Sequence, residues 1–428
     1  MMTKIFHQIW NQRWHNSWIF AELLVIAIFL WMLIDPLYIV YATKAIPDNY
    51  EKKDRYFIEL KCYNNGETNI DVFRNILHKI ENMPEVENHI TTSIASNFND
   101  AGTFVSDVLY PNPEKSIEAY VPVQAFYYYW NRDKYDALHT LGLKDANSGK
   151  LLTIPQKMNP VTQIFVSRAA AINTYGTANV IGRKPKEDYE IIGVYEDYKI
   201  NDYVEPLPSI IYLRNIEEDW FYSSASNKII VKLKKGTNRK LFTQKLDNLL
   251  KEDKLSKFIE DIELISMDEY LENSSASKIA ASTLRPKFIF CIFALACIFL
   301  CMLGTFWTRM DNRRSDIGIM RSMGASRSGV VRQYITEAVI LLTLAFAAAM
   351  PIVLHFVITE GFAAPEVCSF DKQNFAPNPE YGVNNFYIHF AWVTAITYAT
   401  MLLITILGTW IPVYRATRIL PADALREE

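Results

Sequence analysis

The sequence predicts an α-helical membrane protein with four transmembrane helices and a large extracytoplasmic α+β domain between helices 1 and 2. Half of the 428 residues are hydrophobic, yet the mean hydropathy is 0.00. The reason is that four nearly uncharged runs of membrane length alternate with stretches of ordinary soluble composition. A short connection with six arginines, residues 309–337, separates two of these runs, which is typical of a cytoplasmic loop. The net charge of −3 gives no reason to expect a nucleic-acid partner.

The N-terminal residues predict a membrane anchor. Residues 1–17 combine basic and aromatic side chains, as an amphipathic segment at the cytoplasmic interface does. A cleaved signal peptide is the alternative, but the next apolar run, 18–42, is too long and has no small-residue cleavage site. We predict transmembrane helix 1 over 18–42, with Pro36 as a kink or an end. Glu22 and Asp35 are functional candidates because they are charged, but their places near the ends of the run favour interfacial positions.

Residues 43–286 have the composition of a soluble domain. Each end carries a strand–helix–strand pattern, at 56–63, 69–81 and 86–93, and again at 228–234, 238–251 and 261–267. We expect the two patterns to pair into one α+β module formed by 50–110 plus 228–270. The domain then continues as a helical stalk into the second span.

The middle of this domain, 111–227, is predicted to be an inserted β-rich subdomain. Its aromatic run FYYYW at 126–130 fits a ligand platform or an aromatic strand, and the strand is favoured because it needs no ligand. Ser167 and Gly176 are suited to cap a short helix between them.

The remaining chain completes the topology. We predict transmembrane helix 2 at 287–308, a cytoplasmic connection at 309–337, transmembrane helix 3 at 338–358, an extracytoplasmic loop at 359–389, transmembrane helix 4 at 390–412 and a cytoplasmic tail at 413–428. Arg285 and Lys287 lie at an outer end and oppose this orientation, but the six arginines of 309–337 outweigh them. Both termini are therefore expected in the cytoplasm.

The connection 309–337 is more structured than a loop that only fixes topology. From Arg309 to Met323 it has no proline and a single interior glycine, Gly318, so it can form a helix. Gly324 would end that helix, and Ser326 or Ser328 can cap the next one. One face of the first helix is mixed apolar and basic, unlike a solvated face: it carries Met310, Arg313, Arg314, Ile317, Met320, Arg321 and Gly324.

Three stretches resemble a known family. Arg313 with DIGIMR at 316–321 and GAS at 324–326 resembles the R-x-x-E-I-G-I-L-R-A-x-G-A-S signature of MacB/FtsX-type (type VII) ABC transporter permeases. Asp316 stands where the family has glutamate, which keeps the charge and shortens the reach. The tail at 414–427 is similar to the family's R-A-x-R-x-x-P-x-x-A-L-R-x-E ending, and the short motifs of the middle region follow the order found in MacB-type periplasmic domains.

The resemblance implies that 309–337 is a coupling helix that docks on a separate cytoplasmic ATPase. The residues implied in this coupling are Arg313, Asp316, Ile317, Gly318, Met320, Arg321, Gly324 and Ala325. The chain is then a non-catalytic permease subunit of the bacterial inner membrane, working as a homodimer or a heterodimer. A periplasmic adaptor or an outer-membrane component stays open as a further partner, and so does the cargo. The alternative is an FtsX-like regulatory protein that controls an envelope enzyme through its outer domain.

The sequence holds no sign of its own catalytic chemistry. The pattern G-x-x-x-x-G-K-[ST] is absent, and in its nearest approach, Gly142 to Leu151, the glycines are too far apart. No cofactor is expected in this chain, because ATP and Mg²⁺ would bind the partner subunit. No cysteine or histidine spacing indicates a metal site. Cys62 and Cys368 are both expected outside the membrane, and a disulfide between them is left open.

Overall fold

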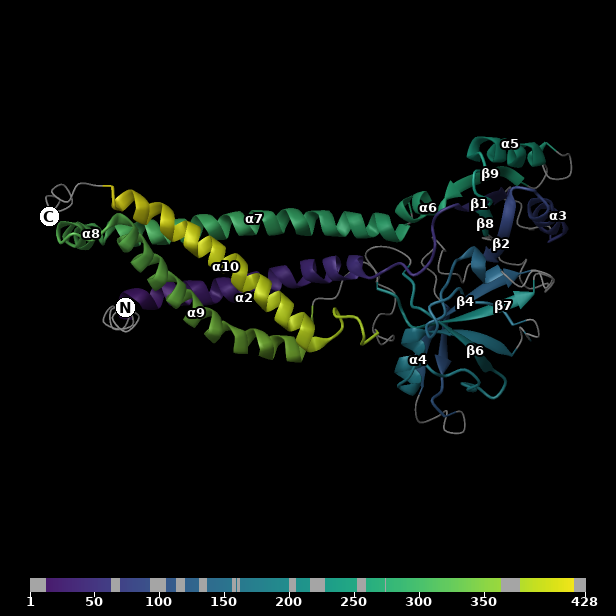
Figure 1. Ribbon diagram of the computed structural model, residues 1–428, viewed down its shortest axis with the longest axis horizontal. Coiled ribbons are helices and arrows are strands. Elements are labelled where there is room, and N and C mark those ends of the chain that lie inside the picture. The colour runs from purple at the N-terminus through teal and green to yellow at the C-terminus, as the bar shows by residue number, and fades with distance from the viewer. Residues whose placement is uncertain are drawn as a thin grey trace. The chain divides into compact units, whose positions relative to one another are not determined.

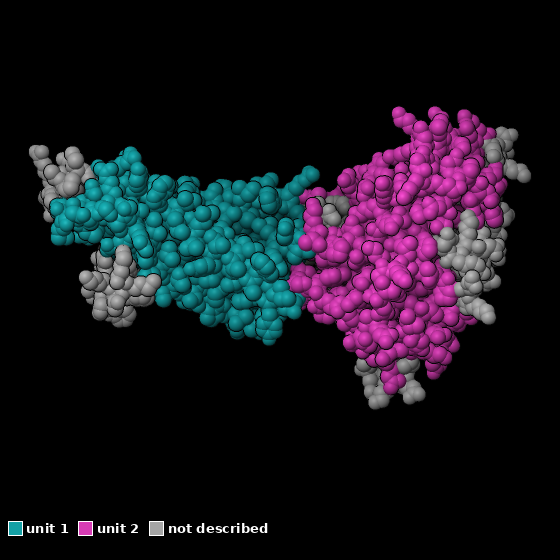
Figure 2. Space-filling model, viewed as in Figure 1, with its two compact units in different colours: residues 1–42, 283–365, 385–428 teal, residues 43–282, 366–384 magenta. Residues whose placement is uncertain are grey.

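The computed structural model describes residues 13–62, 70–92, 105–112, 120–130, 137–155, 159, 162–199, 205–215, 228–251, 259–273, 275–362 and 378–418. The chain divides into two compact units, coloured in Figure 2: unit 1 holds 1–42, 283–365 and 385–428, and unit 2 holds 43–282 and 366–384. Most of the predicted N-terminal segment and of the tail, Cys368, and the side chain of Cys62 lie outside the described residues.

Unit 1 is built from long helices. The helices are α2 (Arg13–Ala45), α7 (Ser275–Asp311), α8 (Arg314–Ser322), α9 (Arg327–Glu360) and α10 (Phe386–Ala416). Four of them are long and apolar enough to cross a membrane, which confirms the predicted four-helix membrane class. The stalk and the second span form one helix that continues through Pro286, and α2 continues through Pro36. Membrane helices tolerate such prolines because neighbouring helices can satisfy the backbone groups that the proline leaves without a hydrogen bond.

Polar side chains inside unit 1 join neighbouring helices. Trp31 of α2 is buried and donates from Nε1 to Thr394 Oγ1 of α10 at 3.2 Å. Asp35 is also buried, and His389 Nε2 lies 2.7 Å from its carboxylate. Glu22 accepts a hydrogen bond from Thr305 of α7 at 3.0 Å. The two acids that the sequence favoured at the membrane interfaces are therefore each partnered across helices.

Unit 2 contains a nine-stranded sheet in the order β6-β5-β7-β4-β2-β8-β1-β9, with β3 on β4 (Figure 1). The strands are β1 (Arg55–Cys62), β2 (Val86–Thr92), β3 (Val105–Leu109), β4 (Val121–Trp130), β5 (Gln163–Ser167), β6 (Glu190–Tyr195), β7 (Ser209–Asn215), β8 (Lys228–Leu233) and β9 (Ile259–Ser266). The short helices are α3 (Ile70–Glu81), η2 (Ala137–Thr140), α4 (Arg168–Tyr175), α5 (Arg239–Leu250) and α6 (Met267–Asn273).

The two strand–helix–strand patterns interlock at one end of this sheet. Strand β1 pairs antiparallel with both β8 and β9, and β2 pairs with the other edge of β8. Helices α3 and α5 cover one face, where Ile80 and Phe242 share a buried cluster with Ile58 and Val231. The alternation of apolar residues along these strands is what supplies the covered face.

The other end of the sheet mixes parallel and antiparallel pairs around β7. Strand β4 runs parallel to β7, and β5 joins β7 antiparallel and β6 parallel. The aromatic run 126–130 forms the end of β4 and packs internally: Tyr127 stacks on Tyr212 with the ring centroids 4.9 Å apart, and the Tyr128 hydroxyl lies 3.0 Å from that of Tyr198. These aromatic contacts fit a core strand rather than a ligand platform.

Candidate functional site

One buried carboxylate on α9 binds an arginine at each end of the short connection between α7 and α8. Arg309, in the last turn of α7, and Arg313, just before α8, both donate to Glu337 on α9. The Arg313 Nη1 to Glu337 Oε2 distance is 3.0 Å and the Arg309 Nη2 to Oε1 distance is 2.5 Å. All three side chains are less than one-tenth exposed. Helix α8 is therefore fixed to the helices on both sides of it.

A tight turn follows α8. Gly324 has φ +93°, a value that side chains with a Cβ rarely adopt. The Ala325 amide donates to the Met320 carbonyl at 3.0 Å, and the Arg321 guanidinium donates to the Ala325 carbonyl at 3.1 Å. Ser326 then accepts from an amide in the first turn of α9, so of the two serines that the sequence indicated, Ser326 is the N-cap.

The mixed apolar and basic face of α8 points into unit 1. Ile317 is 2% exposed and packs in a cluster with Met310, Val330, Tyr334 and Val413. The Arg313 guanidinium lies 5.7 Å from the centre of the Tyr334 ring, in addition to its ion pair. This face therefore holds α8 against α7, α9 and α10.

The opposite face of α8 is open. Asp316, Ile319 and Met323 are all exposed, Ile319 by 44% and Met323 by 76%. Spacings of three and four residues place them on one side of the helix. Ile319 and Met323 thus form a small exposed apolar pair beside an acid.

The structure thus divides the predicted coupling residues into three groups by burial. Arg313, Ile317 and Gly318 are buried, Met320, Arg321 and Ala325 are half-buried, and Asp316 and Gly324 are exposed. Sequence reasoning missed Ile319, Met323 and Glu337. A sequence signal that could have identified Glu337 is its position: it is an acid at the boundary between an arginine-rich connection and an apolar run.

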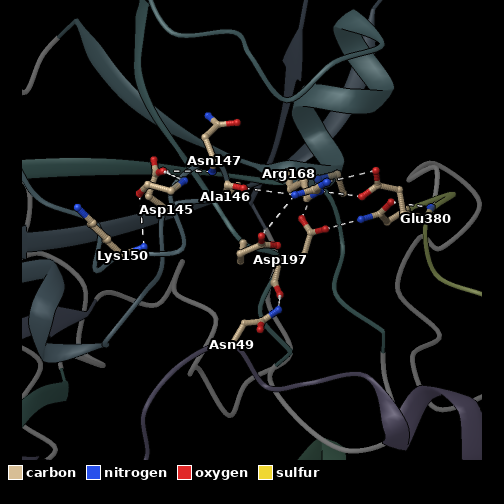
Figure 3. A network of polar contacts seen from close by, with 12 residues as sticks. Asn49, Asp145, Ala146, Asn147, Lys150, Arg168, Asp197 and Glu380 are labelled. Atoms are coloured by element: carbon tan, nitrogen blue, oxygen red, sulfur yellow. Dashed lines mark hydrogen bonds and ion pairs between the residues drawn. The ribbon is translucent and has the colours of Figure 1, made fainter.

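A second site lies in unit 2, in the segment 196–199 that follows β6 (Figure 3). The carboxylate of Asp197 is buried and accepts from the Ala169 amide of α4 at 2.8 Å and from Asn378 Nδ2 at 2.5 Å. The Asp197 carbonyl accepts from Asn49 Nδ2 at 2.7 Å. We call this segment with its partners the 196–199 junction.

The junction holds two chain segments that are distant in sequence. Lys199 Nζ donates to the Lys44 carbonyl at 3.0 Å, in the last turn of α2. Arg168 pairs with Glu380 at 2.7 Å, and Asn384 donates to Glu205 at 2.8 Å. The segment that leaves α2 and the segment that leads into α10 are thus both fixed to the same part of unit 2.

Burial controls the electrostatics of the junction. It raises the pKa of Asp197 to about 6, although the Ala169 amide and the Asn378 side chain oppose this by donating to the charged form. Burial and the nearby Asp197 carboxylate raise the pKa of Tyr381 above its usual range. The Asp197 carboxylate therefore titrates close to neutral pH.

Neither site resembles a metal centre. Within the described part of the chain, no group of three or more His, Cys, Asp or Glu side chains is placed to hold a metal ion. Sequence reasoning gave no signal for the junction, because Asn378 and Glu380 lay in a stretch expected to be a plain outer loop.

Comparison with known proteins bears on unit 1. The family model of the FtsX-like permease C-terminal domain matches residues 288–421. No curated protein matches the chain.

Two solved structures are similar at low identity. The periplasmic region of MacB from Actinobacillus actinomycetemcomitans is 16% identical, with a TM-score of 0.32 over 52% of this chain and 95% of that one. A domain of a protein described as a permease from Porphyromonas gingivalis is 12% identical, with a TM-score of 0.33 over 51% of this chain and 92% of that one. Residues 288–421, which hold α8, α9 and α10, match the family model of the FtsX-like permease C-terminal domain, and this match agrees with the resemblance seen in the sequence.

Proposed function

We propose that this chain is the permease subunit of an ABC transporter and that the open face of α8 docks on a separate cytoplasmic ATPase. The observation that supports this most is that α8 is held rigidly by Glu337 while it presents Asp316, Ile319 and Met323 outward. A docking element needs both properties, because a loosely held helix would lose binding energy to ordering.

The open face has the chemistry of a docking surface. Ile319 and Met323 would fill an apolar groove on the ATPase and supply most of the binding energy. Asp316 would pair with a basic side chain at the rim of that groove and set the register. Asp316 is one methylene shorter than the glutamate of the family signature, and its exposure leaves it free to reach across such a rim.

Force would pass from α8 along its covalent and ionic connections. Because Glu337 binds an arginine at each end of the α7–α8 connection, a displacement of α8 would shift α7 and α9 with it. Beyond the transmembrane helices, the 196–199 junction holds the segment that leaves α2 and the segment that leads into α10. We propose that movement of these helices thereby reaches the sheet of unit 2, which serves export or mechanical work outside the membrane.

Purification of the full chain from its native membranes tests the docking. The wild type should retain an ABC ATPase, identified by mass spectrometry and by vanadate-sensitive hydrolysis of Mg-ATP. Ile319→Asp and Met323→Asp should each lower the retained activity at least about tenfold, because an unpaired carboxylate would enter an apolar groove. Ile181→Asp is the matched control, since Ile181 is an exposed isoleucine of unit 2.

The outcomes separate the alternatives. Undiminished ATPase in the Ile319→Asp and Met323→Asp preparations would exclude α8 as the docking element. A wild-type chain that retains an envelope hydrolase and no ATPase, even after chemical cross-linking, would replace the transporter role with the regulatory one.

A further inference from the structure

A groove of about 510 Å³ lies between the first turns of α9 and the last turns of α10. On α9, Arg327, Val331 and Ile335 form one stripe at four-residue spacing, and Ser328 and Arg332 belong to the stripe beside it. The wall contributed by α9 therefore places the apolar side chains of Val331 and Ile335 next to two guanidinium groups. The hydroxyls of Ser328 and Thr336 complete this wall.

The wall contributed by α10 is aromatic. Trp410 and Tyr414 line it, stacked with their ring centroids 5.8 Å apart, and Trp410 is 46% exposed. Arg418 donates to the Tyr414 hydroxyl at 2.8 Å and lies over the same ring. The Tyr414 ring is therefore fixed in place, and the groove keeps its aromatic wall.

The two arginines of the groove differ from those that hold α8. Arg309 and Arg313 are buried on Glu337, whereas Arg327 and Arg332 are exposed, and within the described part of the chain no carboxylate forms an ion pair with either. They are available to an anion.

The position of the groove along α9 and α10 indicates how deep the groove lies in the membrane. The apolar run of α9 begins just after Glu337, and Trp410 and Tyr414 form a short aromatic band at the corresponding end of α10. Tryptophan and tyrosine gather at the level of the lipid headgroups. The two arginines would therefore lie at the level of the phosphates of one leaflet.

We propose that this groove binds one anionic phospholipid, with its phosphate on Arg327 and Arg332 and an acyl chain along Val331, Ile335 and Trp410. A guanidinium group matches the geometry of a phosphate, and basic pockets between transmembrane helices take anionic headgroups. The volume lies within the usual range for a small-molecule site. Free phosphate would contact only the two arginines. A phospholipid would contact the arginines with its phosphate and the apolar side chains with an acyl chain. The proposal does not depend on the ATPase.

Native mass spectrometry of the full chain in detergent tests this proposal, with phosphatidylglycerol and phosphatidylcholine titrated separately. The wild type should retain one phosphatidylglycerol at concentrations where phosphatidylcholine dissociates. Each of Arg327→Gln and Arg332→Gln should weaken the adduct about fivefold, and the double variant about 25-fold. The double variant Arg327→Lys/Arg332→Lys should weaken the adduct less than the double glutamine variant, because it keeps both charges but loses the guanidinium geometry. The control is Arg285→Gln/Lys287→Gln, which removes two exposed bases of α7 that lie outside the groove.

Three results would overturn the proposal. The first is equal retention of the two lipids by the wild type. The second is displacement of phosphatidylglycerol by millimolar inorganic phosphate, which would indicate an anion site rather than a lipid site. The third is unchanged lipid binding in a folded Arg327→Gln/Arg332→Gln variant that has lost its ATPase, which would assign the groove to the ATPase interface. Folding of each variant is checked by the protection of the buried Cys291 thiol from alkylation.

Discussion

Replacing Glu337 by glutamine removes one negative charge from between two buried guanidinium groups. The side chain keeps its shape, so the change isolates the charge. Arg309 and Arg313 would then be buried side by side without the carboxylate that both contact, and their mutual repulsion would increase. We expect unit 1 to lose stability and α8 to lose its fixed position.

The magnitude follows from the burial of the three side chains. Removing one partner of a buried ion pair costs about 3–5 kcal/mol, chiefly because the remaining charge stays desolvated. Two arginines share this carboxylate, which favours a large effect. Both arginines have long side chains near the end of the helix bundle and can turn toward water, so we expect a loss near the lower limit of that range. We therefore expect a loss of about 3 kcal/mol, or a decrease in Tm of roughly 6–12 °C for a unit of this size.

A single-cysteine assay reads out the stability of unit 1. Cys291 of α7 is buried, whereas Cys297 and Cys301 are exposed. With the other cysteines replaced by serine, a thiol-reactive dye should label Cys291 only as the helices separate on heating. The midpoint of labelling then gives the Tm of unit 1 in the full chain.

The control is Glu360→Gln, the same substitution at an exposed site on the same helix, which should shift the midpoint by less than about 2 °C. The triple variant Arg309→Met/Arg313→Met/Glu337→Leu should recover most of the stability, since a packed apolar set can replace a buried ionic one. A Glu337→Gln midpoint within 2 °C of the wild type would refute the idea that this ion pair fixes α8.

Three further predictions concern the turn after α8 and the 196–199 junction. Because the folded-state pKa of Asp197 is raised from 3.8 to about 6, the folded protein binds a proton more tightly than the unfolded chain, so this contribution to stability is complete below about pH 4 and disappears as the pH rises through 6. The free energy of unfolding that depends on this proton amounts to roughly 3 kcal/mol. The difference in Tm between wild type and Asp197→Asn should therefore change between about pH 4 and pH 6 and stay constant at higher pH. Gly324→Ala should lower the stability measured in the single-cysteine assay by about 1–2 kcal/mol, because a side chain with a Cβ is strained at a φ of +93°. Gly304→Ala is the control: a Cβ at either glycine meets no atom within 4 Å, but Gly304 is helical, so this change should be neutral or stabilising. Equal effects of the two substitutions would contradict this reasoning. Asn378→Ala should speed hydrogen exchange in 378–384 by about tenfold or more, because it leaves the buried Asp197 carboxylate without one donor, while the exposed Glu380→Gln should change it only slightly; the reverse order would place the main contact at Glu380.

Much of the fold could be predicted from local patterns. The strand β8 and the helix α5 have their predicted bounds within one residue, since alternation and helical spacing are properties of short windows. Ser167 accepts from the Ala170 amide and Gly176 adopts φ 71°, as their residue types indicated. Strand β3 was not predicted, because its five residues VSDVL are too few to show a period.

The sequence by itself determined which segments cross the membrane, where α8 ends and which family its C-terminal part resembles. Each depends on residues close together in the chain, such as an apolar run, a glycine or a motif. Only the tertiary structure decided that Ile317 faces inward and Ile319 outward, that Glu337 joins Arg309 to Arg313, and that Asn378 binds Asp197 across 181 residues. The physical reason is that periodicity gives a helix two faces, whereas the choice of the buried one depends on neighbours that the chain brings together from far away.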